Sequence, residues 1–517
     1  MRFPHHYIAI HGIILAQSEH TGAITMIQCR VMRPALLLLL FTLLTLQPVA
    51  AQSSPAVIRV DQQRHLTLNG PFVGLGAEDD SNLLWSGPNR AAGANPAYDT
   101  RHYVNPRLSA LRMPLVRKFI DVSWFAPTPN GYDWDNLAMQ ALYANLALHY
   151  RNNTQVMLTI WSLPPWLSAN APTYRNTERQ PAIAFPDPEH EEEWVELIID
   201  LLRHLYGMDG SGLHFSNITY IGGPNELESI DASRLVRPYS HLRTRLAEVG
   251  LADRVALFGP DSFVEELLIA HNTPGLSPLL DVYDFHYYAA APFEAGYTAA
   301  IDRLVNATAT SGKQIWLTEF GELSSKNDDW RSLPIFVISG MNHGLAALLV
   351  WNVQDQIYNT SNMPAWGLWG VYESGYALKP AYYAWQMLAA HTPRQGSVYG
   401  HTCDRGQCPG LRLAVVGGSG GALSIIAYNL SDSAYPLELD LGDIEVRRPL
   451  GRYSLDPSQP LPRSLAIPRE AAPPLEGNIL RDTLPPGALV VYATDQPRYT
   501  ASAQAKAGTQ SLSFGIK

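Results

Sequence analysis

The sequence has no block of basic residues, few cysteines and few charges of either sign. Its 517 residues contain 37 Lys and Arg against 47 Asp and Glu, which gives a formal net charge of −10. Nucleic-acid-binding proteins normally carry a basic patch or stripe, so nucleic acid is excluded as an expected partner. Charged residues make up 16% and hydrophobic residues 46% of the chain, a balance typical of a folded protein. A chain of this length is expected to form one large and one smaller domain.

The sequence also lacks an apolar run long enough to cross a membrane within its clearest hydrophobic segment. That segment, residues 35–46, follows Arg33 and precedes the small residues Val49 and Ala51. Spanning a bilayer takes about 20 apolar residues, whereas a basic start, a short apolar run and small residues are typical of a secretory signal. We therefore expect residues 1–51 to be a leader and signal peptide. The mature protein is expected to be secreted, extracellular or periplasmic, without a stable membrane anchor.

Cysteine is scarce, and its positions limit what it can do. Of the three cysteines, Cys29 lies in the predicted leader, whereas Cys403 and Cys408 share the segment HTCDRGQC. An oxidising compartment and a short glycine-containing loop favour a disulfide between these two residues. Zinc is the alternative, but with His401 the segment supplies at most three ligands, and nothing nearby completes a tetrahedral structural site. We expect no metal site, no cofactor and, in this part of the chain, a disulfide.

Residues 72–391 alternate short apolar runs with amphipathic helical stretches. In residues 191–205, for example, apolar side chains recur at helical spacing while the acidic ones face outwards. Such alternation is typical of βα units and a parallel sheet, and eight repeats predict a (β/α)8 TIM barrel. A doubly wound open sheet is the alternative, but no glycine-rich phosphate turn follows an early run. The eight runs are residues 72–77, 115–120, 156–161, 218–222, 255–259, 282–287, 314–318 and 346–351.

Tryptophan is absent after Trp385, and the character of the chain changes after residue 391. Short runs rich in Val, Leu, Ile and Tyr, separated by Gly, Pro and Ser, predict a C-terminal antiparallel β-sandwich domain at residues 392–494. Because a sugar-binding module usually offers an aromatic platform, a structural role is expected for this domain. Residues 52–71 are also strand-like and are interpreted as a segment that can join it. Residues 495–517 are expected to form a flexible tail.

Two glutamates follow the fourth and seventh runs of the predicted barrel. The fourth run leads into Gly-Gly-Pro-Asn225-Glu226, and the seventh into Trp-Leu-Thr-Glu319. Active sites of TIM barrels lie at the C-terminal ends of the strands, and paired carboxylates are what glycosidic cleavage requires. Each glutamate alone could be a solvated loop acid. Because both stand at predicted strand ends, catalysis is the better interpretation.

These motifs resemble the retaining glycoside hydrolases of clan A, in which an Asn-Glu pair ends strand four and a second Glu ends strand seven. The likeness extends to PLVRKF, WSLPPWL, DFHYY and LLVWN on the second, third, sixth and eighth runs. Many members of the clan have proline after Asn-Glu, whereas this chain has Leu227. The WSLPPWL segment is similar to family 30, and HYY and LKPAYYAWQML look more like families 39 and 5. The family is therefore not resolved.

The resemblance implies catalytic roles for the two glutamates. Glu226 would be the acid/base and Glu319 the nucleophile of a double displacement with net retention. Arg117 would be a fixed cation that lowers the pKa of Glu319, although a structural ion pair in the barrel is equally compatible. Asn225 would hydrogen-bond the sugar 2-hydroxyl, or else cap its own loop.

The remaining candidate substrate-binding residues are assigned from side-chain chemistry. Tyr288 would hydrogen-bond the nucleophile, and His286 would hold a sugar hydroxyl or the acid/base, unless it is a structural histidine. Trp351 and Trp161 would offer stacking faces for sugar rings, with core packing as the alternative. Glu78 would bind outer hydroxyls, as would Asp79, and either could simply be solvated.

The expected function is that of a secreted retaining β-glycosidase acting on β-linked oligo- or polysaccharides, with carbohydrate as its partner. A non-catalytic carbohydrate-binding barrel is the alternative, as is a transglycosylase that shares every catalytic residue. These motifs do not determine which sugar is recognised or whether cleavage is exo or endo. Both properties depend on loops such as residues 82–103 and 167–189. Nothing in the sequence selects an oligomeric state.

Overall fold

The computed structural model of the chain describes residues 56–81, 100–168, 185–226, 231–323, 329–355, 366–370, 374–406 and 408–495. The predicted leader and signal peptide at residues 1–51 lie outside these residues, as do the tail after residue 495 and Leu227. Most of the loops at residues 82–103 and 167–189 also fall outside them. No helix within the described part of the chain is long and apolar enough to cross a bilayer.

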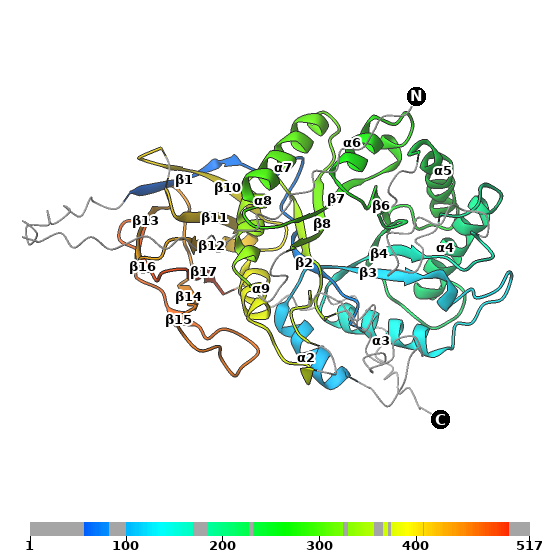
Figure 1. The fold of residues 1–517 in the computed structure, drawn as a ribbon, viewed down its shortest axis with the longest axis horizontal. Helices are drawn as coiled ribbons and strands as arrows, with labels where there is room; N and C mark the ends of the chain where they lie inside the picture. The colour runs from blue at the N-terminus through cyan, green and yellow to red at the C-terminus, as the bar shows by residue number, and fades with distance from the viewer. Residues whose placement is uncertain are drawn as a thin grey trace, which may run out of the picture. The chain divides into compact units, whose positions relative to one another are not determined.

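Eight parallel strands close into a barrel (Figure 1). Each predicted run coincides with one strand to within a few residues, so the predicted TIM barrel is confirmed. Hydrogen bonds link each strand to the next, and β2 pairs with β9 to close the ring. The strands are β2 (Gly74–Glu78), β3 (Leu115–Asp121), β4 (Gln155–Ser162), β5 (Ile218–Gly222), β6 (Ala256–Gly259), β7 (Val282–Ala289), β8 (Ile315–Glu322) and β9 (Ala347–Val350).

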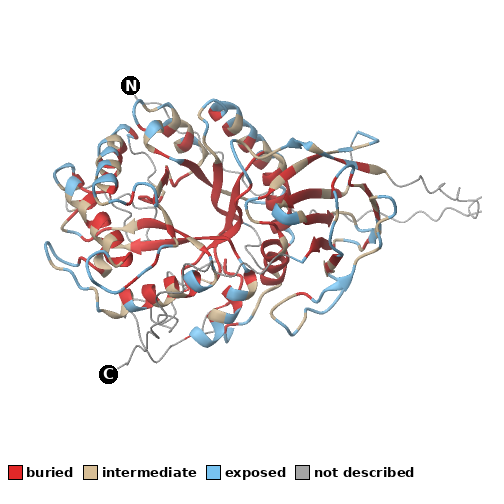
Figure 2. Ribbon diagram, turned by 180° about the vertical axis from the view of Figure 1, so that it is seen from behind, coloured by how far each residue is buried: buried red, intermediate tan, exposed pale blue. Residues whose placement is uncertain are grey.

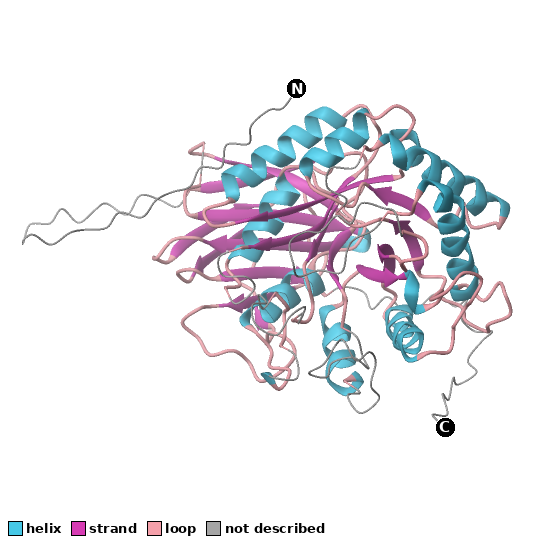
Figure 3. Ribbon diagram, turned by 45° about the vertical axis from the view of Figure 1, so that its right-hand side comes forward, coloured by secondary structure: helices cyan, strands magenta, loops and turns pink. Residues whose placement is uncertain are grey.

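A helix follows each barrel strand and lies outside the ring (Figure 3). In α4, three glutamates, Glu191 to Glu193, occupy the first turn, where they complement the helix dipole, and Trp194, Leu197 and Leu201 are buried against the strands. The helices are α2 (Arg101–Leu111), α3 (Leu137–Arg151), α4 (Glu191–Leu205), α5 (Ser233–Glu248), α6 (Val264–Asn272), α7 (Glu294–Thr308), α8 (Ser332–Asn342) and α9 (Pro380–His391).

The barrel strands are buried on both faces, as parallel strands covered by helices must be (Figure 2). The end of the barrel interior where the strands begin is filled by an apolar cluster that includes Leu115, Met157 and Trp316. Buried charged side chains stand further along the strands, such as Arg117 in β3 and Glu319, preceded by Thr318, in β8. Because buried charges are rare unless they are paired, these residues mark the end of the barrel where chemistry is expected.

The other strands form one nine-stranded sheet, in the order β15-β14-β17-β12-β11-β10-β1-β13-β16. The N-terminal strand β1 belongs to this sheet, where it pairs antiparallel with β10 and parallel with β13. The strands are β1 (Val57–His65), β10 (Ser397–Cys403), β11 (Leu411–Gly418), β12 (Ala422–Asn429), β13 (Tyr435–Asp440), β14 (Leu450–Leu455), β15 (Glu470–Ala471), β16 (Ile479–Leu484) and β17 (Leu489–Thr494).

The sheet curls so that its two ends face each other across a hydrophobic core of their own. Arg452 of β14 and Asp482 of β16 stand near opposite ends of the strand order, yet they form an ion pair at 2.8 Å. This arrangement confirms the predicted antiparallel β domain beside the barrel. Cys403 and Cys408, at the β10–β11 connection, are joined by the expected disulfide.

Helices α8 and α9 pack between the barrel strands and the nine-stranded sheet (Figure 1). Asn342 at the end of α8 donates a hydrogen bond to the Leu413 carbonyl of β11 at 2.9 Å. Arg412 of β11 also forms a bidentate ion pair with Glu294 of α7, at 2.6 and 2.7 Å. One hydrophobic cluster runs through the helices and into the sheet, so the β domain supports this side of the barrel.

Phe336 of α8 is the centre of an aromatic cluster behind β8. It is fully buried, and its ring centroid lies 4.1 Å from that of Phe293 and 4.9 Å from that of Phe320. We expect Phe336→Ala to lower the free energy of unfolding by about 3–5 kcal/mol, because the truncation leaves a cavity. Urea unfolding measures the change. The control Ile269→Ala, at a side chain that is 52% exposed, should stay within about 0.5 kcal/mol; equal losses in both variants would contradict the packing described.

Candidate active site

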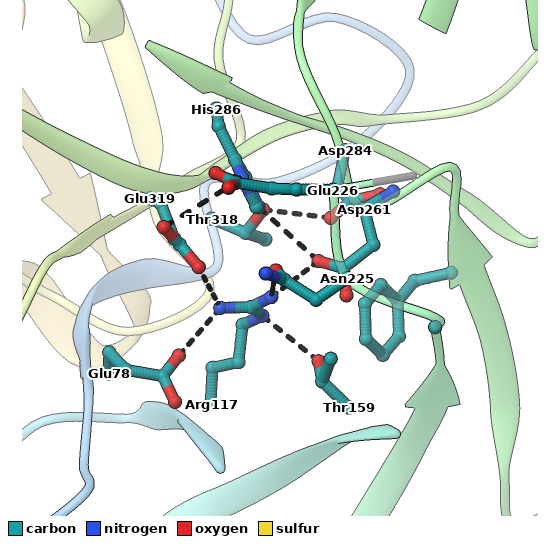
Figure 4. A network of polar contacts seen from close by, with 12 residues as sticks. Glu78, Arg117, Thr159, Asn225, Glu226, Asp261, Asp284, His286, Thr318 and Glu319 are labelled. Carbon is teal, nitrogen blue, oxygen red and sulfur yellow. Dashed lines mark hydrogen bonds and ion pairs between the residues drawn. The ribbon is translucent and has the colours of Figure 1, made fainter. Parts of the chain in front are cut away.

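Arg117 lies at the centre of a polar network at the C-terminal ends of the barrel strands (Figure 4). Its Nη1 donates to Glu78 Oε2 at 2.7 Å and to Glu319 Oε1 at 2.5 Å. Its Nη2 donates to Asn225 Oδ1 at 2.6 Å and to Asp261 Oδ1 at 2.7 Å, and its Nε donates to Thr159 Oγ1 at 3.0 Å. All N–H donors of the guanidinium are therefore used. Each acceptor comes from a different strand or the loop after it: β2, β8, β5, β6 and β4.

The network is buried, which makes its charges strongly dependent on one another. The side chains of Arg117, Glu78 and Asp261 are 0% exposed. Burial favours the neutral form of Asp261, but Arg117 and His286 outweigh it and lower the pKa of that carboxyl. For Glu78 burial dominates, helped by Asp80 and Glu319, and the pKa is raised well above its usual value despite Arg117. Arg117 itself is held charged, because the surrounding carboxylates raise its pKa against the effect of burial.

Two similar turns present Glu226 and Asp261. Gly223-Pro224-Asn225 follows β5, and Gly259-Pro260-Asp261 follows β6. Glu226 (φ 49°) and Asp261 (φ 59°) both adopt left-handed backbone conformations, which are uncommon for residues other than glycine. The Glu226 N–H donates to the Asp261 carbonyl at 2.8 Å, so the two turns are joined directly. Strained backbone of this kind concentrates at functional sites.

His286 and Tyr288, two residues apart on β7, both face the site. His286 Nδ1 lies 2.8 Å from Glu226 Oε1, and its Nε2 lies 3.3 Å from Asp261 Oδ1. The Tyr288 hydroxyl donates to Glu319 Oε2 at 2.8 Å. The β7–β8 register pairs His286 with Glu319, which brings the nitrogen Nδ1 to 3.8 Å from Glu319 Oε2. His286 therefore touches both glutamates and holds them on one side of the barrel mouth.

The two glutamates lie close together. One carboxylate oxygen of Glu226 and one of Glu319 are within 4.8 Å of each other and of a His286 nitrogen. The side chain of Glu226 is 16% exposed and that of Glu319 5%. The expected lowering of the Glu319 pKa by Arg117 is not the net result: burial raises the pKa, while His286 and Arg117 act in the opposite direction. The sequence indicates the cation but not the extent of burial, and burial dominates.

Aromatic rings border the network. Tyr288 packs edge-on against Trp351, with ring centroids 6.3 Å apart, and against Trp366 at 5.5 Å. Trp161 packs against Phe119 at 5.6 Å, and the Phe119 ring lies 4.7 Å from the Arg117 guanidinium. Trp351 and Trp161 are partly buried, so each retains some exposed ring surface. Trp366 and Phe119 were not identified from the sequence.

Asp79 does not join its neighbour Glu78 in this network. Its Oδ2 accepts from Asn145 Nδ2 at 2.8 Å and lies 2.6 Å from His149 Nε2, both on α3. Asp79 is completely buried there and ties β2 to a helix of the barrel wall. A direct contact with sugar hydroxyls is therefore the wrong expectation for Asp79. Glu78 is likewise 0% exposed, so it acts on the site through Arg117.

Four residues of the network were missed by sequence reasoning: Thr159, Asp261, Asp284 and Thr318. Asp284 Oδ1 accepts from the Asp261 N–H at 2.9 Å, and its Oδ2 accepts from Thr318 Oγ1 at 2.8 Å. Burial, followed by the charge of Asp261, raises the pKa of Asp284 to about 7. A usable signal existed for Asp261, because Gly-Pro-Asp after β6 repeats the Gly-Pro-Asn pattern after β5.

Two sets of side chains place three ligand atoms close enough to share a metal ion. They are Glu226, His286 and Glu319, and Asp261, Asp284 and His286. The spacing in the sequence does not reveal either set, because each combines residues from different strands or the turns after them; only Asp284 and His286 share a strand. Both sets include His286, whose two nitrogens are each directed at a carboxylate. A metal bound to His286 in either set would have to replace one of these hydrogen bonds.

Comparisons with known proteins support the fold. No protein-family model and no curated protein sequence matches the chain. Among solved structures, it is similar to the catalytic domain of a family 30 xylanase from Talaromyces cellulolyticus, with a TM-score of 0.61, 14% identity and coverage of 85% of this chain and 100% of the other. A family 39 β-xylosidase from Caulobacter crescentus gives a TM-score of 0.55 and 16% identity, with 85% and 100% covered.

A glucosidase from Croceicoccus marinus is similar to the same extent, with a TM-score of 0.55, 12% identity and coverage of 85% and 99%. The resemblance to clan A glycoside hydrolases is thus confirmed at the level of the fold. Several families of that clan are represented among the similar structures, so the family remains unresolved, as the sequence motifs indicate.

Arg117 is predicted to be essential for stability. Removing one partner of a buried ion pair leaves an uncompensated charge, so Arg117→Met should lower the free energy of unfolding by about 3–5 kcal/mol at pH 8. The lowered pKa of Asp261 means that Arg117 stabilises the fold above the unfolded Asp pKa and less as pH falls. The deficit should therefore persist at pH 5, above the unfolded Asp pKa of about 3.9, and shrink in urea unfolding at about pH 3. Thr159→Val, which removes a neutral partner, is the control; a deficit independent of pH would contradict the charge network.

Proposed function

We propose that the protein is a secreted retaining β-glycosidase that hydrolyses O-glycosidic bonds of β-linked oligo- or polysaccharides. The observation that carries the proposal is the proximity of the Glu226 and Glu319 carboxylates, within 4.8 Å between their nearest oxygens, at the C-terminal ends of the barrel strands. Retaining glycosidases hold their carboxyl groups about 5–5.5 Å apart, whereas inverting enzymes need about 6.5–9.5 Å to admit a water molecule. The signal-like segment at residues 33–51 and the disulfide favour export.

Glu319 is the nucleophile in this proposal. Both of its oxygens accept hydrogen bonds, Oε1 from Arg117 and Oε2 from Tyr288, and such donors stabilise the ionised form that attacks the anomeric carbon. As the bond to carbon forms, the bond to the leaving oxygen breaks, and Glu226 gives that oxygen its proton. The product of this step is a covalent glycosyl-enzyme ester on Glu319.

The second step reverses the proton flow. Glu226 is now a carboxylate and takes a proton from water, whose oxygen attacks the anomeric carbon from the face that the leaving group occupied. Glu319 departs as a carboxylate, and the configuration of the product is that of the substrate. Asn225 is oriented for substrate in both steps: its Oδ1 is bound to Arg117, which leaves its amide N–H groups to donate to a sugar hydroxyl.

The aromatic border fits a carbohydrate ligand. Trp351 is partly exposed and its ring centroid lies 6.3 Å from that of Tyr288, so it places aromatic surface, on which sugar rings commonly pack, beside Glu319. The similar structures carry names that span a xylanase, a β-xylosidase and a glucosidase, which supports a β-linked substrate and leaves its sugar open.

A substrate panel tests the proposal directly. It comprises aryl β-xyloside, glucoside, mannoside, galactoside and arabinoside, together with soluble β-glucan and xylan. We expect hydrolysis of at least one member, with retained configuration by NMR, and loss of that activity in Glu226→Gln and Glu319→Gln. Glu265→Gln, an exposed carboxylate on α6, is the control and should behave like the wild type. Sugar binding without turnover of any member would contradict the proposal.

Azide distinguishes the nucleophile from the acid/base. Glu319→Ala should abolish turnover of aryl glycosides, because no carboxylate remains to form the glycosyl-enzyme. Added azide fills the vacated space and should restore part of the rate, with a glycosyl azide of inverted configuration as product. Glu226→Ala should instead yield an azide product of retained configuration. Full activity of Glu319→Ala without azide would refute the assignment.

Tyr288 should set the acidic limb of the pH profile. Burial raises the Glu319 pKa, whereas the Tyr288 hydroxyl, which bonds to the ionised form, lowers it. Since the nucleophile must be ionised, kcat/KM is lost as pH falls, and the limb should lie above the usual Glu pKa of about 4.3. Tyr288→Phe should move this limb to higher pH. Tyr287→Phe, whose ring packs against Tyr297 on the outer side, should leave it in place; a limb that does not move in Tyr288→Phe would show that the hydroxyl does not tune Glu319.

A further inference from the structure

Asp261 contacts Glu226 through both its backbone and its side chain. Its carbonyl accepts the Glu226 N–H at 2.8 Å, and its carboxylate lies 3.3 Å from His286, which in turn lies 2.8 Å from the Glu226 carboxylate. The three residues therefore form a closed ring of hydrogen bonds. Asp261 is itself held in place, because its N–H donates to Asp284 at 2.9 Å and its backbone adopts a left-handed conformation. A strained and fully buried aspartate of this kind is expected to have a function.

His286 has carboxylates on every polar side. Glu226 from the end of β5, Asp261 from the end of β6 and Glu319 from β8 face its ring nitrogens, and its own strand adds Asp284. Arg117 on β3 is the other cation of the network. The Phe263 ring lies nearly perpendicular to that of His286, with the ring centroids 6.0 Å apart. The backbone N–H of His286 donates a hydrogen bond to the Ser262 carbonyl at 2.7 Å, which holds the backbone of His286 in place.

Both ring nitrogens of His286 face carboxyl groups to which they can donate. Asp261 has a lowered pKa and, as an anion, only accepts hydrogen bonds, so Nε2 carries a proton; Nδ1 likewise donates to Glu226 when the ring is charged. Burial disfavours the imidazolium, but Glu319, Asp261 and Glu226 outweigh it and raise the pKa of His286 to about 10. The ring is thus a fixed cation, and it cannot serve as a neutral base at neutral pH.

A charged His286 determines the orientation of the Glu226 proton. Because Nδ1–H donates to Oε1, that oxygen is an acceptor, and a proton on Glu226 must reside on Oε2. We propose that Asp261 is a positioning residue that keeps His286 doubly protonated and thereby fixes the oxygen from which Glu226 delivers its proton. The role of Glu226 in this statement rests on the proposed function. The pairing of Asp261 with His286 stands on geometry alone.

Asp261→Asn separates charge from shape. Asp261 Oδ1 accepts from both Arg117 and His286, and among the described residues Oδ2 is buried without a hydrogen-bond partner. The amide of asparagine has the same size, and its oxygen can still accept from Arg117. It cannot compensate the charge of His286, so the variant weakens the imidazolium while the packing is retained.

The first measurement is the protonation of His286, which does not depend on activity. Histidine-selective 15N NMR of the whole protein, with His286→Gln for assignment, reports both ring nitrogens as pH varies. In the wild type we expect a doubly protonated ring from pH 6 to 8. In Asp261→Asn the titration should move down by about one pH unit or more, because a neighbouring negative charge has been removed. A neutral His286 ring in the wild type at pH 7 would overturn the proposal, whether or not the variant folds.

The second measurement compares leaving groups. Dinitrophenolate departs without protonation, whereas an alkyl or sugar leaving group needs the proton of Glu226. Asp261→Asn should therefore lower kcat/KM about 10- to 100-fold for a β-linked disaccharide, a part of the general-acid contribution of roughly 10²–10⁴-fold. Its effect on the dinitrophenyl glycoside should be much smaller.

Thr159→Val is the matched control, because it removes another Arg117 partner without touching His286. It should affect both substrates alike. Equal losses for both substrates in Asp261→Asn would mean that Asp261 acts through Arg117 and Glu319, and would overturn the proposal. Absence of turnover in the wild type would instead overturn the proposed function, while the NMR titration would still confirm or refute the pairing of Asp261 with His286.

Discussion

The hydrogen bonds of the Arg117 guanidinium are the constraint on which the rest of the site depends. A charge buried inside a barrel is tolerated only when it is paired and fully hydrogen-bonded, and Arg117 meets this condition with acceptors from five other strand ends. The same bonds fix those strand ends relative to one another. The energetic requirement of the cation and the geometric requirement of the chemistry are therefore met by one set of contacts, which orders Glu319 and Asn225 before any substrate arrives.

The charge balance of the network explains why its carboxyl groups differ. Five carboxyl groups surround two cations, Arg117 and His286; they belong to Glu78, Glu226, Asp261, Asp284 and Glu319. A buried site with two cations cannot stabilise all five carboxyl groups as anions. Burial raises the pKa of Glu78 well above its usual value and that of Asp284 to about 7, so it favours the neutral form of both. If Glu226 is also protonated, as the proposed first step requires, Asp261 and Glu319 would be the anions that balance the two cations, and the site would then be close to electrically neutral.

The sequence predicts the frame of this site better than its interior. Hydrophobic runs with a regular alternation locate all eight barrel strands, and strand ends locate Glu226 and Glu319, because both signals are local. The partners of Arg117 are not local: Glu78 and Glu319 are separated from it by 39 and 202 residues. A periodic pattern in the sequence does not show that residues so far apart come together in space. It also does not show how deeply Glu319 is buried, and this burial raises its pKa despite the opposing effect of Arg117. Asp261 could have been predicted from the sequence, because its Gly-Pro-Asp turn repeats the turn that presents Asn225.

The two glutamates are supported in different ways, and the difference matches what each would do. Glu319 lies within β8, whose next residue, Phe320, packs against Phe336 of α8, and α8 is hydrogen-bonded to the nine-stranded sheet. A nucleophile that forms a bond to carbon needs this rigid support, because small displacements cost much of the rate. Glu226 instead follows β5 in a turn and is held by Asp261 and His286. A residue that gives and then takes a proton needs a defined orientation and a stable electrostatic environment, and a ring of hydrogen bonds with a fixed cation supplies both. In the proposed reaction the β domain would therefore act by supporting Glu319, and the β6 turn by directing Glu226.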